Sequence, residues 1–111
     1  MSKTIKSISI KMKNLGETLR ELRKNKQLPL RTVAAYLDID PAIMSRIERG
    51  QRNANREQVI KLAGYFNVDE NGLLVAWLSD KVVYEVLDED IALQALRVAE
   101  EHIKYLKTKK Q

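Results

Sequence analysis

The sequence predicts an all-α fold, and three observations lead to that prediction. The chain of 111 residues has only 4 glycines and 2 prolines, which argues against a turn-rich β fold. A composition that is 44% hydrophobic and 5% aromatic suits a compact helical protein. From residue 14 onward, apolar residues recur at helical spacing between residues that cap helices. A chain of this length forms one domain, or one domain with an appendage.

Residues 1–13 alternate between isoleucine or methionine and serine or lysine, which fits either a weak strand or a basic arm. We assign them as a basic N-terminal arm. The first helix is expected from Asn14 to about Lys26, because Asn14 and Glu17 have the spacing of a capping box. Apolar residues then recur in this helix at i, i+4 and i+7, namely Leu15, Leu19 and Leu22.

Two short helices are expected next, over residues 30–37 and 41–49. Asp40 suits the N-cap of the second of these, and Pro41 suits its first position, where the N–H that proline lacks has no partner in any case. Gly50 closes this helix, because glycine tolerates the left-handed conformation common at helix ends.

Three further helices are expected over residues 55–66, 69–87 and 88–107. Asn55 and Gln58 repeat the capping-box spacing at the start of the first of them. The last one begins with three acidic residues and ends with lysines, which is the arrangement that the helix dipole favours.

Residues 30–49 have the pattern of a helix-turn-helix. Counted from Leu30, the fifth position is small, the ninth is a residue that can turn sharply, and the fourth, eighth, tenth, fifteenth and eighteenth are apolar. These positions hold Ala34, Asp38, Val33, Leu37, Ile39, Met44 and Ile47. Such a pattern braces two helices at a wide angle and leaves the outer face of the second one free for the major groove of DNA.

The run LRTVAAYLDIDPAIMSRIERG, over residues 30–50, resembles the Cro/repressor (XRE) family of helix-turn-helix regulators. In that family the reading helix typically ends in the string that residues 45–50 form here. The resemblance extends over about residues 14–72 and implies a five-helix, lambda-repressor-like DNA-binding domain. Two positions depart from the family pattern: Asp38 replaces the usual glycine, and Leu30 replaces a glutamine that often contacts the DNA backbone.

The resemblance also implies roles for individual side chains. Arg46 takes the position of a major-groove base reader, and arginine forms two hydrogen bonds with guanine O6 and N7. Glu48 takes the position of a structural glutamate, which pairs in the family with an arginine of the first helix, here Arg23. The expected DNA contacts are Ala42, Ser45 and Arg46 to bases, and Arg31, Arg49, Arg52 and Arg56 to phosphates.

Charge is unevenly distributed along the chain. Residues 1–66 carry fourteen basic and six acidic side chains, whereas residues 67–103 carry two basic and nine acidic ones. The acidic segment is also rich in apolar residues, so we predict that residues 73–111 form a dimerisation element. The expected contacts are Leu74, Trp77, Leu78, Leu96, Ala99 and Ile103. The alternative is an intramolecular hairpin that leaves no apolar surface exposed.

Several classes of function are excluded by composition. The chain has no cysteine and a single histidine, His102, so it offers no thiolate site, disulfide or histidine pair for a metal. No nucleophile–base pair suggests an enzyme, and we expect no catalytic residue, metal, cofactor or small-molecule ligand. No apolar run approaches the roughly 20 residues that span a membrane, and the first residues lack the apolar stretch and the cleavage site of a secretory signal. We therefore expect a cytoplasmic, nucleoid-associated protein that does not bind membranes.

These features together predict a sequence-specific regulator of transcription that binds double-stranded DNA. We expect a homodimer on a palindromic operator, because a two-fold dimer sets two reading helices about 34 Å apart. An autoregulator or a controller of a restriction–modification operon fits the size of the chain. The alternative is an antitoxin-type or protein-interaction module, in which the helix-turn-helix serves protein contacts.

Overall fold

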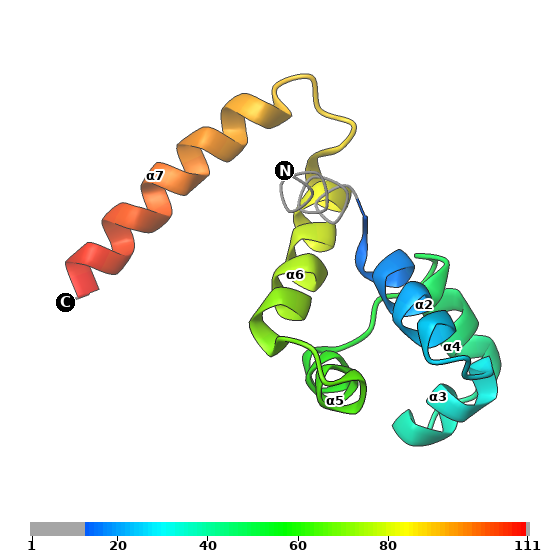
Figure 1. Cartoon of the computed structure of the whole chain (residues 1–111). Coiled ribbons are helices and arrows are strands. Elements are labelled where there is room, and N and C mark those ends of the chain that lie inside the picture. The colour runs from blue at the N-terminus through cyan, green and yellow to red at the C-terminus, as the bar shows by residue number, and fades with distance from the viewer. Residues whose placement is uncertain (1–12, 111) are drawn as a thin grey trace, which may run out of the picture. The chain divides into compact units, whose positions relative to one another are not determined.

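A computed structural model describes residues 13–110, which contain six helices and no strand (Figure 1). The helices are α2 (Leu15–Asn25), α3 (Leu30–Leu37), α4 (Pro41–Glu48), α5 (Arg56–Phe66), α6 (Glu70–Val86) and α7 (Ala92–Lys110). The all-α prediction is confirmed, and α2 to α6 are the five helices expected of the DNA-binding domain. The basic arm assigned to residues 1–13 lies outside the described residues, apart from its last residue.

Local side-chain caps explain where the helices begin. Asn14 and Glu17 form the predicted capping box of α2: the Asn14 side chain accepts a bond of 2.8 Å from the Glu17 N–H, and the Glu17 carboxylate accepts one of 3.2 Å from the Asn14 N–H. Asn55 and Gln58 form the same reciprocal pair before α5, at 2.8 and 2.9 Å. At α4 the Asp40 carboxylate accepts from a backbone N–H at 2.7 Å. These bonds satisfy donors that a helix start leaves without partners.

The last helix differs from its prediction at both ends. α7 begins at Ala92 rather than residue 88, because residues 87–91 form turns in which the Glu89 N–H bonds to the Val86 carbonyl at 2.9 Å. Aspartate is a weak helix former, and three adjacent carboxylates repel one another, so the acidic run 88–90 precedes the helix. α7 then continues to Lys110, since nothing in its sequence interrupts it.

The core lies in the first of two compact units, which ends at Asp80. It combines the inner faces of all five helices with the loop after α4, through Leu15, Leu19, Val33, Ala34, Leu37, Met44, Ile47, Ala54, Val59, Leu62, Ala63, Phe66, Leu73 and Trp77. The boundary expected after residue 72 therefore falls inside α6, whose first half completes this core.

Trp77 corrects one prediction. We expected it at a dimer contact, but only 7% of it is exposed, and its indole Nε1 donates to the Ala54 carbonyl at 2.6 Å. The prediction was wrong because the apolar residues of α6 surround the helix, and their sequence pattern does not distinguish the face turned to the core. Leu74 is half-buried against the same core, whereas Leu78 is 50% exposed.

Asp80 joins α6 to the start of α2. Its carboxylate accepts a bond of 2.9 Å from the Leu15 backbone N–H, which is one of the four free donors of that helix start. Burial raises the pKa of Asp80 above its ordinary range, the bond from Leu15 opposes this rise, and the nearby charge of Glu17 adds to it. The contact fixes the N-terminal end of α2 against α6.

The second compact unit comprises residues 81–111, with the last part of α6 and all described parts of α7. From residue 78 to residue 109, no described side chain is buried. Many of its large apolar side chains are exposed, more than is usual for the surface of a small protein, including Leu87 at 71%, Leu93 at 70% and Ile103 at 53%.

Among the described residues, no helix is long and apolar enough to cross a membrane.

Candidate nucleic-acid interface

The helices α3 and α4 form the predicted helix-turn-helix. Asp38 takes the left-handed conformation at φ 58° and ψ 46°, which confirms it as the turn residue in place of glycine. The next residue, Ile39, donates its backbone N–H to the Ala34 carbonyl at 3.0 Å and closes the end of α3. Ala34 itself is fully buried, so its small side chain permits the close crossing of the second helix.

A buried ion pair holds the reading helix α4 to α2. Arg23 Nε lies 2.7 Å from Glu48 Oε2, and Arg23 Nη2 lies 3.0 Å from Glu48 Oε1, so the pair is bidentate. Arg23 Nη1 also donates to the Leu28 carbonyl at 2.9 Å. The hydrogen bond to Glu48 raises the pKa of Arg23, against the opposite effect of burial. The pair that the resemblance implied is therefore present, and it fixes the angle between the two helices.

Gly16 brings the same two helices into direct contact. It is buried in the first turn of α2, and a Cβ at this position would lie 2.6 Å from the Ile47 carbonyl oxygen of α4. No real Cβ tolerates such a distance, so any side chain here would push the reading helix away. This role could not be predicted from the sequence, because a glycine near a helix start carries no signal of what lies opposite it.

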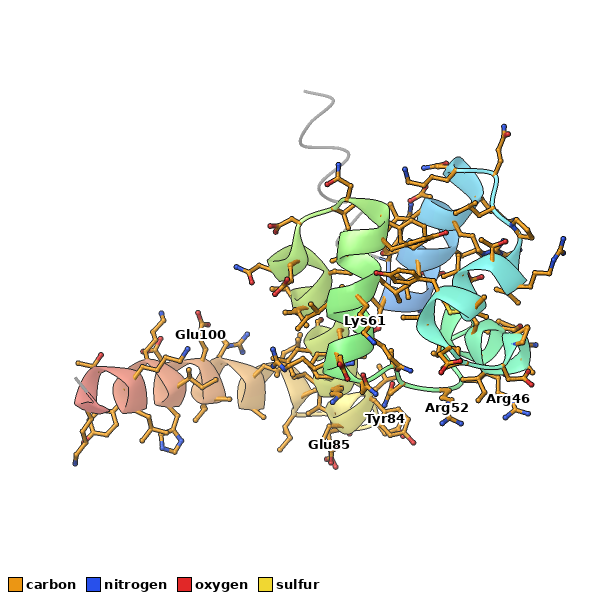
Figure 2. All side chains as sticks on the ribbon, turned by 90° about the horizontal axis from the view of Figure 1, so that it is seen from below. Arg46, Arg52, Lys61, Tyr84, Glu85 and Glu100 are labelled. Carbon is orange, nitrogen blue, oxygen red and sulfur yellow. The ribbon has the colours of Figure 1, made fainter. Side chains whose placement is uncertain are left out.

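The outer face of α4 carries the expected base-reading residues. Ala42 and Arg46 are exposed, whereas Ser45 is half-buried. In Figure 2 the side chains of Arg46 and Arg52 project to the same side of the domain, away from the helices. An exposed guanidinium on a helix whose other face is buried can reach into a groove of DNA, while the helix itself stays fixed.

The loop after α4 is tied to the core by Trp77. Besides its bond to the Ala54 carbonyl, the indole ring lies beneath the Arg56 guanidinium, whose Cζ is 5.2 Å from the ring centroid. Arg56 is exposed and opens α5, so it remains available to an anion while the ring restricts its position. Arg52 in the loop and Arg31 in the first turn of α3 are also exposed, as a phosphate contact requires.

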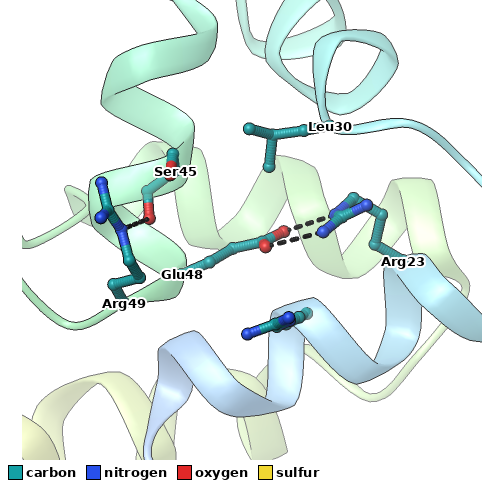
Figure 3. Close-up of a pocket in the computed structure, with 6 residues that line it drawn as sticks. Arg23, Leu30, Ser45, Glu48 and Arg49 are labelled. Atoms are coloured by element: carbon teal, nitrogen blue, oxygen red, sulfur yellow. Dashed lines mark hydrogen bonds and ion pairs between the residues drawn. The ribbon is translucent and has the colours of Figure 1, made fainter.

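An open pocket of about 280 Å³ lies where α2, α3 and α4 meet (Figure 3). Three arginines and one carboxylate line it together with two other residues, and the full set is Arg20, Arg23, Leu30, Ser45, Glu48 and Arg49. Because Glu48 neutralises only Arg23, the pocket keeps an excess of positive charge. Among residues 13–110, no carboxylate lies within ion-pair distance of Arg20 or Arg49, although Arg49 Nε bonds to the Ser45 carbonyl at 3.4 Å.

This pocket adds Arg20 to the candidate site. Arg20 was not among the residues predicted from the sequence, although a signal was available: it precedes Arg23 by three residues and so lies on the same face of α2. Two guanidinium groups without carboxylate partners among the described residues line this one pocket, and such groups are donors that suit an anion such as a phosphate.

The comparisons with known proteins match the same region of the chain. The sequence model of the helix-turn-helix family matches residues 19–73. Two curated proteins of Bacillus subtilis (strain 168) are similar: the uncharacterized HTH-type transcriptional regulator RghRB is 36% identical over 66 residues, and the HTH-type transcriptional repressor RghR is 36% identical over 64 residues. The matches cover 59% and 57% of this chain. The chain spans about half the length of these relatives, 48% and 47% respectively.

Among solved structures, the restriction-modification controller protein C.AhdI from Aeromonas hydrophila is 36% identical in sequence and aligns with a TM-score of 0.49. That match covers 53% of this chain and 89% of the controller. The family match coincides with the helices that carry the turn at Asp38 and the Arg23–Glu48 pair. The chain therefore belongs to the helix-turn-helix family of the Cro/repressor (XRE) type.

Proposed function

We propose that this chain is a regulator of transcription, not an enzyme, and that it binds double-stranded DNA with sequence specificity. The observation that carries the proposal is the reading helix α4, which is anchored on its inner face by a buried bidentate ion pair and exposes Arg46 on its outer face. One similar protein is named a transcriptional repressor, which favours repression as the sign of regulation. We propose that this chain acts in the cytoplasm, at the nucleoid.

The proposed readout divides between bases and backbone. Arg46 pairs with a guanine edge, while Ala42 contacts a thymine methyl group and Ser45 a base edge or a phosphate. The phosphate contacts comprise the exposed arginines around α4, together with the pocket between α2 and α4. These residues are Arg20, Arg31, Arg49, Arg52 and Arg56. Such contacts fix the position of the domain on the duplex, whereas base contacts select the sequence.

The proposed assembly is a homodimer on a palindromic operator. The apolar side chains that remain exposed along α6 and α7, such as Leu78 and Ile103, support it. A surface of this kind on a small protein needs a partner, and a second copy would double the DNA contacts of one reading helix. The proposed contacts are Leu74, Leu78, Leu96, Ala99 and Ile103, without the buried Trp77.

Selection from a pool of random duplexes at two salt concentrations tests the DNA proposal. We expect binding that weakens steeply with salt and enriches a palindrome. Arg46→Ala should reduce the ratio of affinities for the preferred and the other bases at one base pair of each half-site by about 5- to 150-fold. This change corresponds to the roughly 1–3 kcal/mol of such a contact. Arg97→Ala, at an exposed arginine of α7, is the control for loss of charge and should keep the preference. A chain that retains no duplex at low salt would refute the proposal and favour the protein-interaction alternative.

Sedimentation tests the homodimer separately. Leu96→Lys places a charge on the apolar face of α7, whereas Gln94→Lys places the same charge elsewhere on that helix. Leucine, glutamine and lysine have similar helix propensities, so the pair differs mainly in the face that is altered. We expect monomers for Leu96→Lys and dimers for Gln94→Lys. A wild-type chain that sediments as a monomer would refute this part of the proposal without affecting the DNA part.

A further inference from the structure

The helix α7 presents an apolar stripe that the described residues of the second unit leave partly or largely exposed. Its residues follow a 4-3-4-3 spacing, which places them on one side of a helix: Ala92, Leu96, Ala99, Ile103 and Leu106. Ile103 is 53% exposed and Leu106 is 48% exposed, while Ala92 and Leu96 are half-buried. A helix of 19 residues with no buried side chain among those described has little to stabilise it alone in water. The stripe therefore needs an occupant.

Charge is arranged along this segment in three blocks. Three carboxylates precede the helix at residues 88–90, and three lysines end it at residues 107, 109 and 110. Between them, two positive and two negative residues balance, and Lys104 Nζ lies 3.6 Å from carboxylate oxygens of both Glu100 and Glu101. α7 is about 27 Å long at 1.5 Å per residue. Its ends are thus several times farther apart than the screening length of about 8 Å at physiological salt, so they do not neutralise each other.

We propose that α7 packs against α7 of a second copy of this chain in antiparallel orientation. The inference rests on the homodimer part of the proposed function and adds which helix pairs and in which direction. In an antiparallel pair, the acidic start of each helix faces the lysine end of the other, and the balanced middle segments face one another. A parallel pair would gather six lysines at one end and six carboxylates at the other, which like-charge repulsion opposes.

The stripe and the charges point to the same occupant. A two-fold axis through the middle of α7 brings residue i opposite residue j and residue j opposite residue i, so an interface of this kind must be complementary to itself. The charge sequence of this segment meets that condition only in the antiparallel direction. The alanines of the stripe, Ala92 and Ala99, let two helix backbones approach closely, and antiparallel helix dipoles attract each other.

Thiol crosslinking tests the orientation, because the chain has no cysteine of its own. Two variants, Ala92→Cys and Leu106→Cys, place single thiols near opposite ends of the stripe, about 21 Å apart along the helix. One variant carries an affinity tag, so that mixed and self-crosslinked products differ in mass. A bis-maleimide much shorter than the helix is added to each variant alone and to the mixture. Thr108→Cys, outside the stripe, is the control for random collisions.

We expect the crosslinked product only in the mixture, because position 92 of one copy lies near position 106 of the other. Self-crosslinking of each variant alone would overturn the antiparallel orientation. Dimers in sedimentation that give no product above the Thr108→Cys control would overturn the pairing of α7 but keep the homodimer. Monomers would overturn the homodimer itself. None of these results depends on whether the chain binds DNA.

A charge-reversal experiment provides a second, independent measurement. Lys107→Glu with Lys109→Glu should weaken dimerisation at low salt by about tenfold or more, since several attractive charge pairs at each end of the interface become repulsive. Adding Asp88→Lys with Glu89→Lys to the same chain should restore it, because both ends are then exchanged. In a parallel pair the first two substitutions would instead relieve the repulsion between the gathered lysines and strengthen dimerisation, and that outcome would overturn the proposal.

Discussion

Replacing Glu48 by glutamine should destabilise the domain strongly. The Glu48 side chain is 5% exposed and that of Arg23 is 14% exposed, so the substitution leaves a guanidinium buried without its counter-charge. Breaking a buried pair in this way costs about 3–5 kcal/mol. Arg23 keeps its bond to the Leu28 carbonyl, and glutamine can still accept one bond, so we take the lower end, about 3 kcal/mol. For a domain of this size, that lowers the Tm by more than about 10 °C.

Urea denaturation of three variants measures the effect. Glu48→Gln, Arg23→Gln and the double variant form a cycle, and we expect a coupling free energy of about 2 kcal/mol or more. The matched control is the pair of Lys13 and Glu21, whose Nζ and Oε1 atoms are 2.5 Å apart but whose side chains are 30% and 54% exposed. Glu21→Gln should cost less than about 1 kcal/mol, because water screens an exposed pair.

The control decides between two explanations. If distance alone set the strength of a pair, Glu21→Gln would cost at least as much as Glu48→Gln, because the exposed pair is the shorter one. Burial predicts the opposite order. Equal losses for the two substitutions, or a coupling within experimental error of zero, would refute the argument that a buried pair sets the angle of α4.

Three further predictions concern packing and pH. Gly16→Ala should destabilise the domain by about 1–3 kcal/mol, because the added methyl group overlaps α4. Gly64→Ala should stabilise α5 by about 0.5–1 kcal/mol, because the space where its Cβ would lie is open. Thermal melts compare the two variants. Trp77→Phe should cost about 1–3 kcal/mol in urea denaturation, because the Ala54 carbonyl loses its donor. Asp80 has a raised pKa, so folding disfavours its ionised form relative to the unfolded chain. Asp80→Asn should therefore raise the Tm at pH 7 and lose this advantage below about pH 4, where the wild-type carboxyl is protonated. A lower Tm at pH 7 would mean that the attraction between the Asp80 carboxylate and the α2 dipole outweighs the cost of burying its charge.

The sequence predicted the parts of the fold that local chemistry determines. The capping boxes at Asn14 and Asn55 predicted the starts of α2 and α5, and Asp40 with Pro41 predicted the start of α4. Asp38 was expected to turn the chain, and it does so at positive φ. Each of these features depends on residues at most three or four apart, and a sequence displays such relations directly.

The features that the sequence did not predict depend on residues far apart in the chain. The inward direction of Trp77 depends on Ala54, which precedes it by 23 residues. The role of Gly16 depends on carbonyls of α4, and that of Arg20 depends on the pocket which α3 and α4 complete. In α6 the apolar residues surround the helix, so periodicity could not distinguish its buried face from its exposed one. The pairing of Arg23 with Glu48 was expected only because a family resemblance supplied it.

The same long-range contacts explain how so small a domain could read DNA. A base contact discriminates only if its side chain returns to the same place, and α4 alone, with 8 residues, is too short to hold its own position. Gly16 and the Arg23–Glu48 pair fix its C-terminal end against α2, while Trp77 fixes the loop that follows. Arg46 projects from α4 between these contacts and does not contribute to the stability of the fold. Substitutions at Arg46 should therefore change sequence preference while leaving the Tm within a few degrees of the wild type, and substitutions at Glu48 should change both.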